Sequence, residues 1–109
     1  MSEAILDVVP VIGDMTVYAM SSYNANEVNA RRKDANDRLP WYHALKPGAQ
    51  MHKGNPVTAG DCFPMMITRV WGVAPTSAVN GQVFLDGNDT LWVTSVVQGD
   101  GEGKFHFLA

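Results

Sequence analysis

The feature that most constrains the fold is a pair of β-prone runs within residues 79–97, which flank the sequence DGND at residues 86–89. An Asp-Gly pair between such runs is a strong hairpin signal, because both residues tolerate the positive φ that a tight turn requires. Strand alternation in the second run places Leu91, Val93 and Ser95 on one face and Trp92, Thr94 and Val96 on the other. The sequence therefore predicts an antiparallel hairpin.

Upstream of the hairpin, residues 24–37 carry the signals of a helix. Asn24 followed three residues later by Glu27 has the spacing of a capping box, in which each side chain satisfies a free backbone amide of the first turn. The apolar positions of this helix form only a narrow stripe, made of Ala25, Val28, the stem of Arg32, and Ala35. The helix therefore needs a partner surface, which is either the β core or another subunit.

Residues 38–60 are predicted to form a long loop. Three prolines and three glycines within 23 residues argue against a long regular element. Loops of this length in compact domains are usually either functional or disordered. Trp41 and Tyr42 argue against disorder, because such large rings normally cover a surface.

The remaining β-type segments complete a single domain over residues 1–109. Residues 13–20 alternate as a first strand, and residues 62–108, which include the hairpin, form a four-strand β core. Five strands with one inserted helix favour a mainly β fold, closed as a small SH3-like barrel or roll. Closure would hide the edges that a flat sheet of this size exposes.

The charge of the chain is unevenly distributed. The formal net charge is −3, yet residues 31–53 hold six basic side chains against two acidic ones. This local excess favours an anionic small molecule or an acidic protein patch over a long nucleic-acid track. The chain has no apolar run long enough to span a bilayer, and its start lacks the basic region of a signal peptide. We therefore expect a cytoplasmic protein with no membrane partner.

The sequence contains no recognisable catalytic or metal site. The single cysteine, Cys62, lies in an apolar run, where a buried and inert thiol is expected, and no serine lies in a Gly-x-Ser-x-Gly elbow. The three histidines are far apart in the sequence, and the Asp86–Asp89 turn lacks the later ligands of a calcium loop. We expect a protein that is not an enzyme and has no cofactor.

Binding residues are easier to propose. Arg31 and Arg32 diverge by about 100° on a helix, so at most one of them faces the core and the other could bind a phosphate. His52 and Asn55 lie in a glycine-containing segment whose amides could bind an anion or a base edge. Ion pairs with Asp34 or Asp37 and hydrogen bonds that stabilise the loop are the alternatives for these four residues.

Aromatic side chains complete the predicted ligand-binding set. Trp41, Tyr42 and Trp92 offer flat faces for stacking. For Trp71 and Trp92, a place in the hydrophobic core is favoured over a role as a stacking platform.

The C-terminal half resembles a widespread group of small tailed-bacteriophage proteins. The resemblance rests on residues 63–71 (FPMMITRVW) and 79–95 (VNGQVFLDGNDTLWVTS), which are similar to that group's VNxQVF–DG–hairpin core. Residues 29–35 (NARRKDA) and 52–57 (HKGNPV) are similar to a longer subgroup. The ending departs from the pattern, because FHFL at residues 105–108 stands where WHWP is usual. The resemblance implies a phage origin and a fold more than a mechanism.

Three functions follow as hypotheses. The first is a non-enzymatic phage protein that counters host antiviral defence, by binding a nucleotide second messenger in a homo-oligomer or by binding a host defence protein. The second is a virion structural or decoration protein. The third is a small-barrel nucleic-acid-binding protein that stacks bases on its rings, which the acidic net charge makes less favourable.

Overall fold

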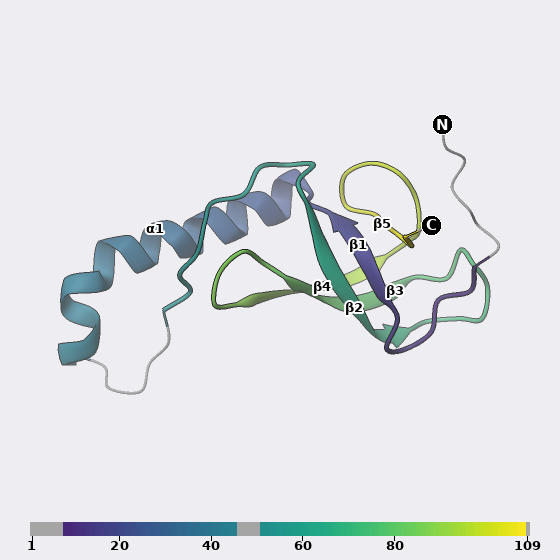
Figure 1. Cartoon of the computed structure of the whole chain (residues 1–109), viewed down its shortest axis with the longest axis horizontal. Helices are drawn as coiled ribbons and strands as arrows, with labels where there is room; N and C mark the ends of the chain where they lie inside the picture. The colour runs from purple at the N-terminus through teal and green to yellow at the C-terminus, as the bar shows by residue number, and fades with distance from the viewer. Residues whose placement is uncertain (1–7, 46–50, 109) are drawn as a thin grey trace.

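The computed structural model describes residues 8–45 and 51–108, and only the backbone of residues 38–45. The elements in chain order are β1 (Met15–Ala19), α1 (Ser22–Leu45), β2 (Cys62–Val70), β3 (Val79–Phe84), β4 (Thr90–Val96) and β5 (Phe105–His106). They form one antiparallel sheet of strand order β4-β3-β2-β1-β5, with α1 projecting beyond it (Figure 1). The expected mainly β fold with five strands and one helix is confirmed.

The expected closure into an SH3-like barrel is wrong. β5 has only two residues and pairs with β1. A single isolated parallel bridge, between Gln98 and Phe105, connects it to the chain that follows β4. A barrel needs a continuous ladder between its two edge strands. One bridge does not supply that ladder, so β4 remains an edge strand of an open sheet.

The predicted helix is correct in place but too short at both ends. Ser21, rather than Asn24, is the N-cap: its Oγ accepts the Asn24 backbone N–H at 3.1 Å and donates to Asn24 Oδ1 at 2.9 Å. At the other end α1 continues to Leu45, through residues assigned to the 38–60 loop. Within residues 38–45 the only helix breaker is Pro40, whereas Pro47, the glycines and Pro56 follow the helix. The predicted loop is therefore wrong over residues 38–45.

The β3–β4 hairpin is confirmed, with one local change. Between the pairs Gly81–Val93 and Val79–Val96, β4 has one residue more than β3. This bulge places Ser95 at φ 56°, and the Asn80 side chain accepts the Ser95 backbone N–H at 3.0 Å. The extra residue turns Val96 inward, where it is buried, against simple alternation.

The core lies on one side of the sheet and at its junction with α1. Its largest fully buried side chains include Tyr18, Phe105, Met20, Met65 and Ile67. The helix contributes Ala25 and Val28 to the core, and Ala35 is buried as well, as the narrow apolar stripe predicted. Cys62 is exposed, contrary to expectation. The helix lacks the apolar character of a membrane-spanning segment.

Candidate functional site

Three of the predicted binding residues meet at one carboxylate, Asp89. Arg32 holds it with two bonds, Nη1 to Oδ2 at 2.9 Å and Nη2 to Oδ1 at 3.0 Å. Arg31 Nη1 donates to Oδ2 at 3.0 Å, and His52 Nδ1 lies 3.4 Å from the same oxygen. We name Arg31, Arg32, His52 and Asp89 the Arg32 cluster. It joins α1, the segment after residue 50, and the start of β4.

Arg32 is the buried centre of this cluster. Its side chain is 5% exposed and that of Asp89 is 4% exposed. Besides the carboxylate, Arg32 donates from Nε to the Asn55 carbonyl at 3.1 Å and from Nη1 to the His52 carbonyl at 2.8 Å. One guanidinium therefore ties two carbonyls of one backbone segment, and the Asp89 side chain, to the helix. Such a bidentate, charge-assisted pair is both strong and geometrically specific.

Two glycines allow the chain to approach this closely. Gly54 and Gly87 form an isolated antiparallel bridge across which Arg32 lies. A Cβ on Gly54 would lie 2.5 Å from the Asp86 carbonyl oxygen, and a Cβ on Gly87 would lie 2.5 Å from the Lys53 carbonyl oxygen. Both clashes are with backbone, so neither glycine can be replaced without moving the chain.

Hydrogen bonds on both sides of the bridge fix the segment after residue 50. The Asn29 side chain bonds the Val57 backbone twice, accepting its N–H and donating to its carbonyl, each at 2.8 Å. Asn55 Nδ2 donates to Asp86 Oδ2 at 2.7 Å. The segment is thereby held between α1 and the β3–β4 turn, which gives the helix the partner surface that its sequence requires.

Electrostatics favour the charged form of Asp89. Burial on its own would raise the pKa of this carboxyl, but hydrogen bonds and charge from Arg32 and Arg31 outweigh it and lower the pKa below its ordinary value. The carboxylate is therefore a stable internal counter-ion for the two arginines.

The Arg32 cluster consequently differs from the site that the sequence suggested. Arg31, Arg32, His52 and Asn55 do come together, yet they face two carboxylates, Asp89 and Asp86, and backbone carbonyls of the protein itself. Asp37, one of the alternative partners expected for the arginines, accepts instead from Lys33 Nζ at 2.6 Å. Asp89 was overlooked because a DGND turn already explains an aspartate at that position.

The aromatic members of the predicted set lie outside this cluster. Trp92 is on β4 and is 62% exposed, so the core role considered for it is wrong. Trp71 is 54% exposed at the end of β2, where Arg69 lies over its ring at 4.2 Å. Trp41 and Tyr42 lie in α1, but their side chains are outside the described residues.

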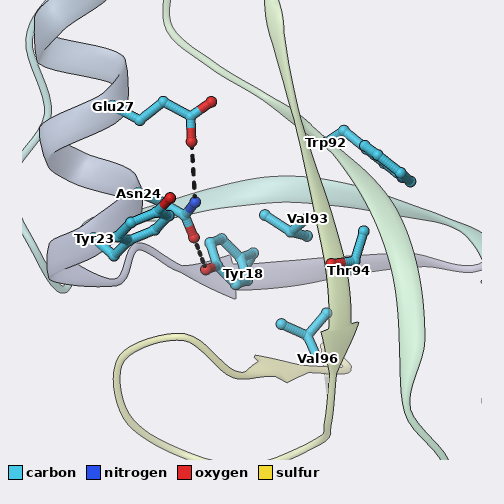
Figure 2. A pocket seen from close by; sticks show the side chains of 8 residues that line it. All are labelled: Tyr18, Tyr23, Asn24, Glu27, Trp92, Val93, Thr94 and Val96. Atoms are coloured by element: carbon cyan, nitrogen blue, oxygen red, sulfur yellow. Dashed lines mark hydrogen bonds between the residues drawn. The ribbon is translucent and has the colours of Figure 1, made fainter.

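A separate pocket of about 270 Å³ lies beside the start of α1, near the edge strand β4. Its lining comes from β1, α1 and β4: Tyr18, Tyr23, Asn24, Glu27, Trp92, Val93, Thr94 and Val96. In Figure 2, Tyr23 and Glu27 lie on the helix side, whereas the Trp92 ring extends beyond β4, away from the helix. We name this hollow the α1–β4 pocket.

A chain of hydrogen bonds runs along the helix side of this pocket (Figure 2). The Tyr18 hydroxyl donates to Asn24 Oδ1 at 2.8 Å, and Asn24 Nδ2 lies 3.5 Å from Glu27 Oε1. The other Glu27 oxygen lies 3.4 Å from Arg31 Nη2. The contacts to Glu27 are long, and its side chain is 46% exposed, so its oxygens can accept further hydrogen bonds.

The pocket can therefore bind a flat group that carries N–H donors. The Tyr23 side chain is 80% exposed and offers a ring face, and the Glu27 carboxylate accepts from donors. Arg31, with three contacts for its five N–H groups, lies next to Glu27 as a cation. Sequence reasoning treated Asn24 and Glu27 only as a helix cap, and Tyr23 carried no signal of its own.

In the described part of the chain, no group of three or more histidine, cysteine, aspartate or glutamate side chains could hold a metal ion. The fold and the pocket describe a small mainly β protein with a polar side pocket. No family model matches the chain, and no curated protein or solved structure matches it.

Proposed function

We propose that the chain is a non-enzymatic bacteriophage protein that counters host antiviral defence by binding a nucleotide-type signal in an oligomer. The phage assignment rests on the sequence resemblance at residues 63–71 and 79–95. The binding assignment rests on one observation: Glu27, which lines the α1–β4 pocket, has the cation Arg31 as a neighbour at 3.4 Å.

These two side chains suit the base and the charge of a nucleotide-type ligand. A base such as guanine presents adjacent N–H donors, which the Glu27 carboxylate can accept while the base lies against Tyr23. Arg31, at 22% side-chain exposure and 3.4 Å from Glu27, adds a cation of the type that binds phosphate. The proposed ligand site thus moves from the predicted set to the pocket. Of that set, Trp92 lines the pocket and Arg31 lies next to the pocket residue Glu27.

Calorimetry with the purified protein tests this proposal. The panel contains guanosine, adenosine and inosine monophosphates, cyclic dinucleotides and ADP-ribose. We expect guanine-bearing members to bind, and Glu27→Gln to weaken that binding at least about tenfold, because it removes an acceptor for charged or strong donors. Inosine monophosphate, which lacks the exocyclic amine of guanine, should also bind more weakly.

Asp37→Asn is the matched control, since it neutralises another exposed carboxylate of α1 whose contact is with Lys33. It should leave binding unchanged. Absence of heat with every member of the panel, or equal affinity of the Glu27→Gln and wild-type proteins, would refute the proposed site. Plating of a phage that lacks the gene on defended and undefended hosts tests the anti-defence role separately.

A virion component is the second candidate. The observation that favours it is the exposure of several large apolar side chains on the sheet, among them Phe84 and Met66. High copy number of the protein in purified particles would support this candidate over the first. The nucleic-acid candidate loses support, because the formal net charge is −3 and Arg32 is buried against Asp89.

A further inference from the structure

The side-chain amide of Asn24 lies between groups that fix its orientation (Figure 2). Its oxygen, Oδ1, accepts from the Tyr18 hydroxyl at 2.8 Å and from the Ser21 hydroxyl at 2.9 Å. On the opposite side, its nitrogen, Nδ2, lies 3.5 Å from Glu27 Oε1. An ionised carboxylate only accepts hydrogen bonds, so the nitrogen of the amide must face it. These contacts together determine which end of the amide faces Glu27.

The opposite orientation of the amide is unfavourable. It would place Oδ1 against the Glu27 carboxylate, so that two acceptors would face each other. It would also take the oxygen away from the Tyr18 hydroxyl, which belongs to a side chain that is 1% exposed and needs a partner when buried. The Ser21 hydroxyl additionally accepts the Asn24 backbone N–H at 3.1 Å, which ties the amide to the helix cap. The amide is therefore held in place from the core and from the cap.

The nitrogen of this amide can still donate to a ligand. A primary amide nitrogen carries two N–H donors. Among the residues that the structure describes, the contact of Nδ2 is the one to Glu27, and 3.5 Å is longer than a typical N–H···O bond. Asn24 and Glu27 both line the α1–β4 pocket. A ligand in this pocket therefore meets a free N–H donor beside a carboxylate that has accepting capacity.

This order of groups matches one of the common bases. A donor next to the two oxygens of a carboxylate is complementary to an acceptor followed by two donors. Guanine has that order along one edge, in its 6-oxo group, its N1–H and its 2-amino group. Adenine and cytosine place an amino donor where guanine has its oxygen, and uracil has a carbonyl on each side of a single N–H. The pocket thus has donor and acceptor groups complementary to a 6-oxo, 2-amino purine.

We propose that Asn24 is a specificity-determining residue of the α1–β4 pocket, donating from Nδ2 to the 6-oxo group of a guanine base whose N–H donors bind Glu27. Tyr18 and Ser21 are positioning residues, because they act on the ligand through the orientation of the Asn24 amide. The inference rests on the proposed nucleotide site and gives the reason for a guanine base there.

Calorimetry of the full chain with guanosine monophosphate and 6-thioguanosine monophosphate tests the donor. The thio analogue keeps both N–H groups that face Glu27 and replaces the 6-oxo oxygen by sulfur, a weaker acceptor. The wild-type protein should bind the oxygen compound at least about threefold more tightly. This comparison needs no substitution in the protein.

Asn24→Asp is the corresponding variant. It keeps an oxygen for the Tyr18 and Ser21 hydroxyls but replaces Nδ2 by a carboxylate oxygen. Binding of guanosine monophosphate should weaken at least about tenfold, because an acceptor then faces the 6-oxo group. The preference for oxygen over sulfur should disappear. Circular dichroism checks that the variant remains folded.

Asn26→Asp is the matched control, since Asn26 is exposed on the first turns of α1 and does not line the pocket. It introduces the same charge and should bind both nucleotides like the wild type. Tyr18→Phe keeps the ring and removes the hydroxyl that orients the amide. It should reduce the preference for oxygen over sulfur, whereas a merely structural role would weaken both nucleotides equally.

Equal affinities of the wild-type protein for the two nucleotides, an unchanged preference in Asn24→Asp, or equal effects of Asn24→Asp and Asn26→Asp would overturn the role of Asn24. If Glu27→Gln still weakens binding of guanosine monophosphate in that case, the proposed nucleotide site stands and this inference alone fails. Absence of heat with every nucleotide would refute the proposed site and the role of Asn24 together.

Discussion

The Arg32 cluster and the α1–β4 pocket both contain charged side chains. Those of the cluster are mostly buried and paired, whereas the carboxylate of the pocket is partly exposed. In the cluster, the guanidinium of Arg32 and the carboxylate of Asp89 are almost fully buried and hold each other through two bonds. In the pocket, Glu27 is nearly half exposed and has only long contacts. Charged residues whose bonding capacity is used inside the protein stabilise the fold, whereas those with capacity left over can bind a ligand.

This contrast shows why residue type alone does not identify a binding residue. Both arginines of the predicted set are good phosphate binders in isolation. The fold supplies an internal anion, Asp89, which occupies the position that an external anion would take. Substitutions in the two regions separate residues that stabilise the fold from residues that bind a ligand.

The largest effect is expected for Asp89→Asn. Removing the charge leaves Arg32 buried without a counter-ion, and breaking a buried pair in this way costs about 3–5 kcal/mol of unfolding free energy. Chemical denaturation measures the loss. Asp86→Asn, at an exposed turn carboxylate that accepts from Asn55, should cost only about 1 kcal/mol. Equal losses for the two variants would contradict the structural role of the cluster.

The two arginines should differ from each other. Arg32→Met removes the donor of four hydrogen bonds, to Asp89, Asn55 and His52, and should cost about 3 kcal/mol of unfolding free energy. Arg31→Met affects a side chain that is 22% exposed, and should cost about 1 kcal/mol or less. A reversed order, again by chemical denaturation, would move the centre of the cluster to Arg31.

Acid should weaken the cluster. Because the pKa of Asp89 is lower in the folded protein than in the unfolded chain, its contribution to stability is present above the ordinary carboxyl pKa of about 4. The contribution is lost as the pH falls through the folded-state pKa. The stability difference between wild type and Asp89→Asn should therefore shrink progressively below about pH 4. Denaturation curves across that range test this, and a constant difference would contradict it.

The smallest effect on stability is expected in the pocket. Glu27→Gln and Tyr23→Ala alter exposed side chains and should each change the unfolding free energy by no more than about 0.5 kcal/mol. The same variants should weaken nucleotide binding, as measured by calorimetry. Loss of stability comparable to that of Arg32→Met would make the pocket another structural contact.

Local signals were sufficient for several elements of the fold. The DG turn between β-prone runs specified the hairpin, because turn geometry and alternation act over only a few residues. The 3.6-residue period also identified the buried face of α1, including the burial of Arg32. The helix ends were less well predicted, since Ser21 was not recognised as the cap and the chain remains helical through Pro40.

Contacts between segments that are distant in the chain were not predicted from the sequence. Arg32 and Asp89 are 57 positions apart, and nothing local indicates that they meet. The requirement for glycine at positions 54 and 87 likewise follows from their close approach in space. The sheet would be closed only if β5 and the chain after β4 formed a full ladder, and they form one bridge. The alternation of residues within each strand does not specify that pairing.

By itself, the sequence determined a small mainly β chain with a hairpin, and a helix that needs a surface to pack against. Alternation, turn chemistry and helical periodicity carry that information because each acts between residues that are near in the chain. Only the tertiary structure decided which charges are paired and which stay open. The free energy of a charge depends on burial and on its neighbours in space, and those neighbours come from distant parts of the sequence.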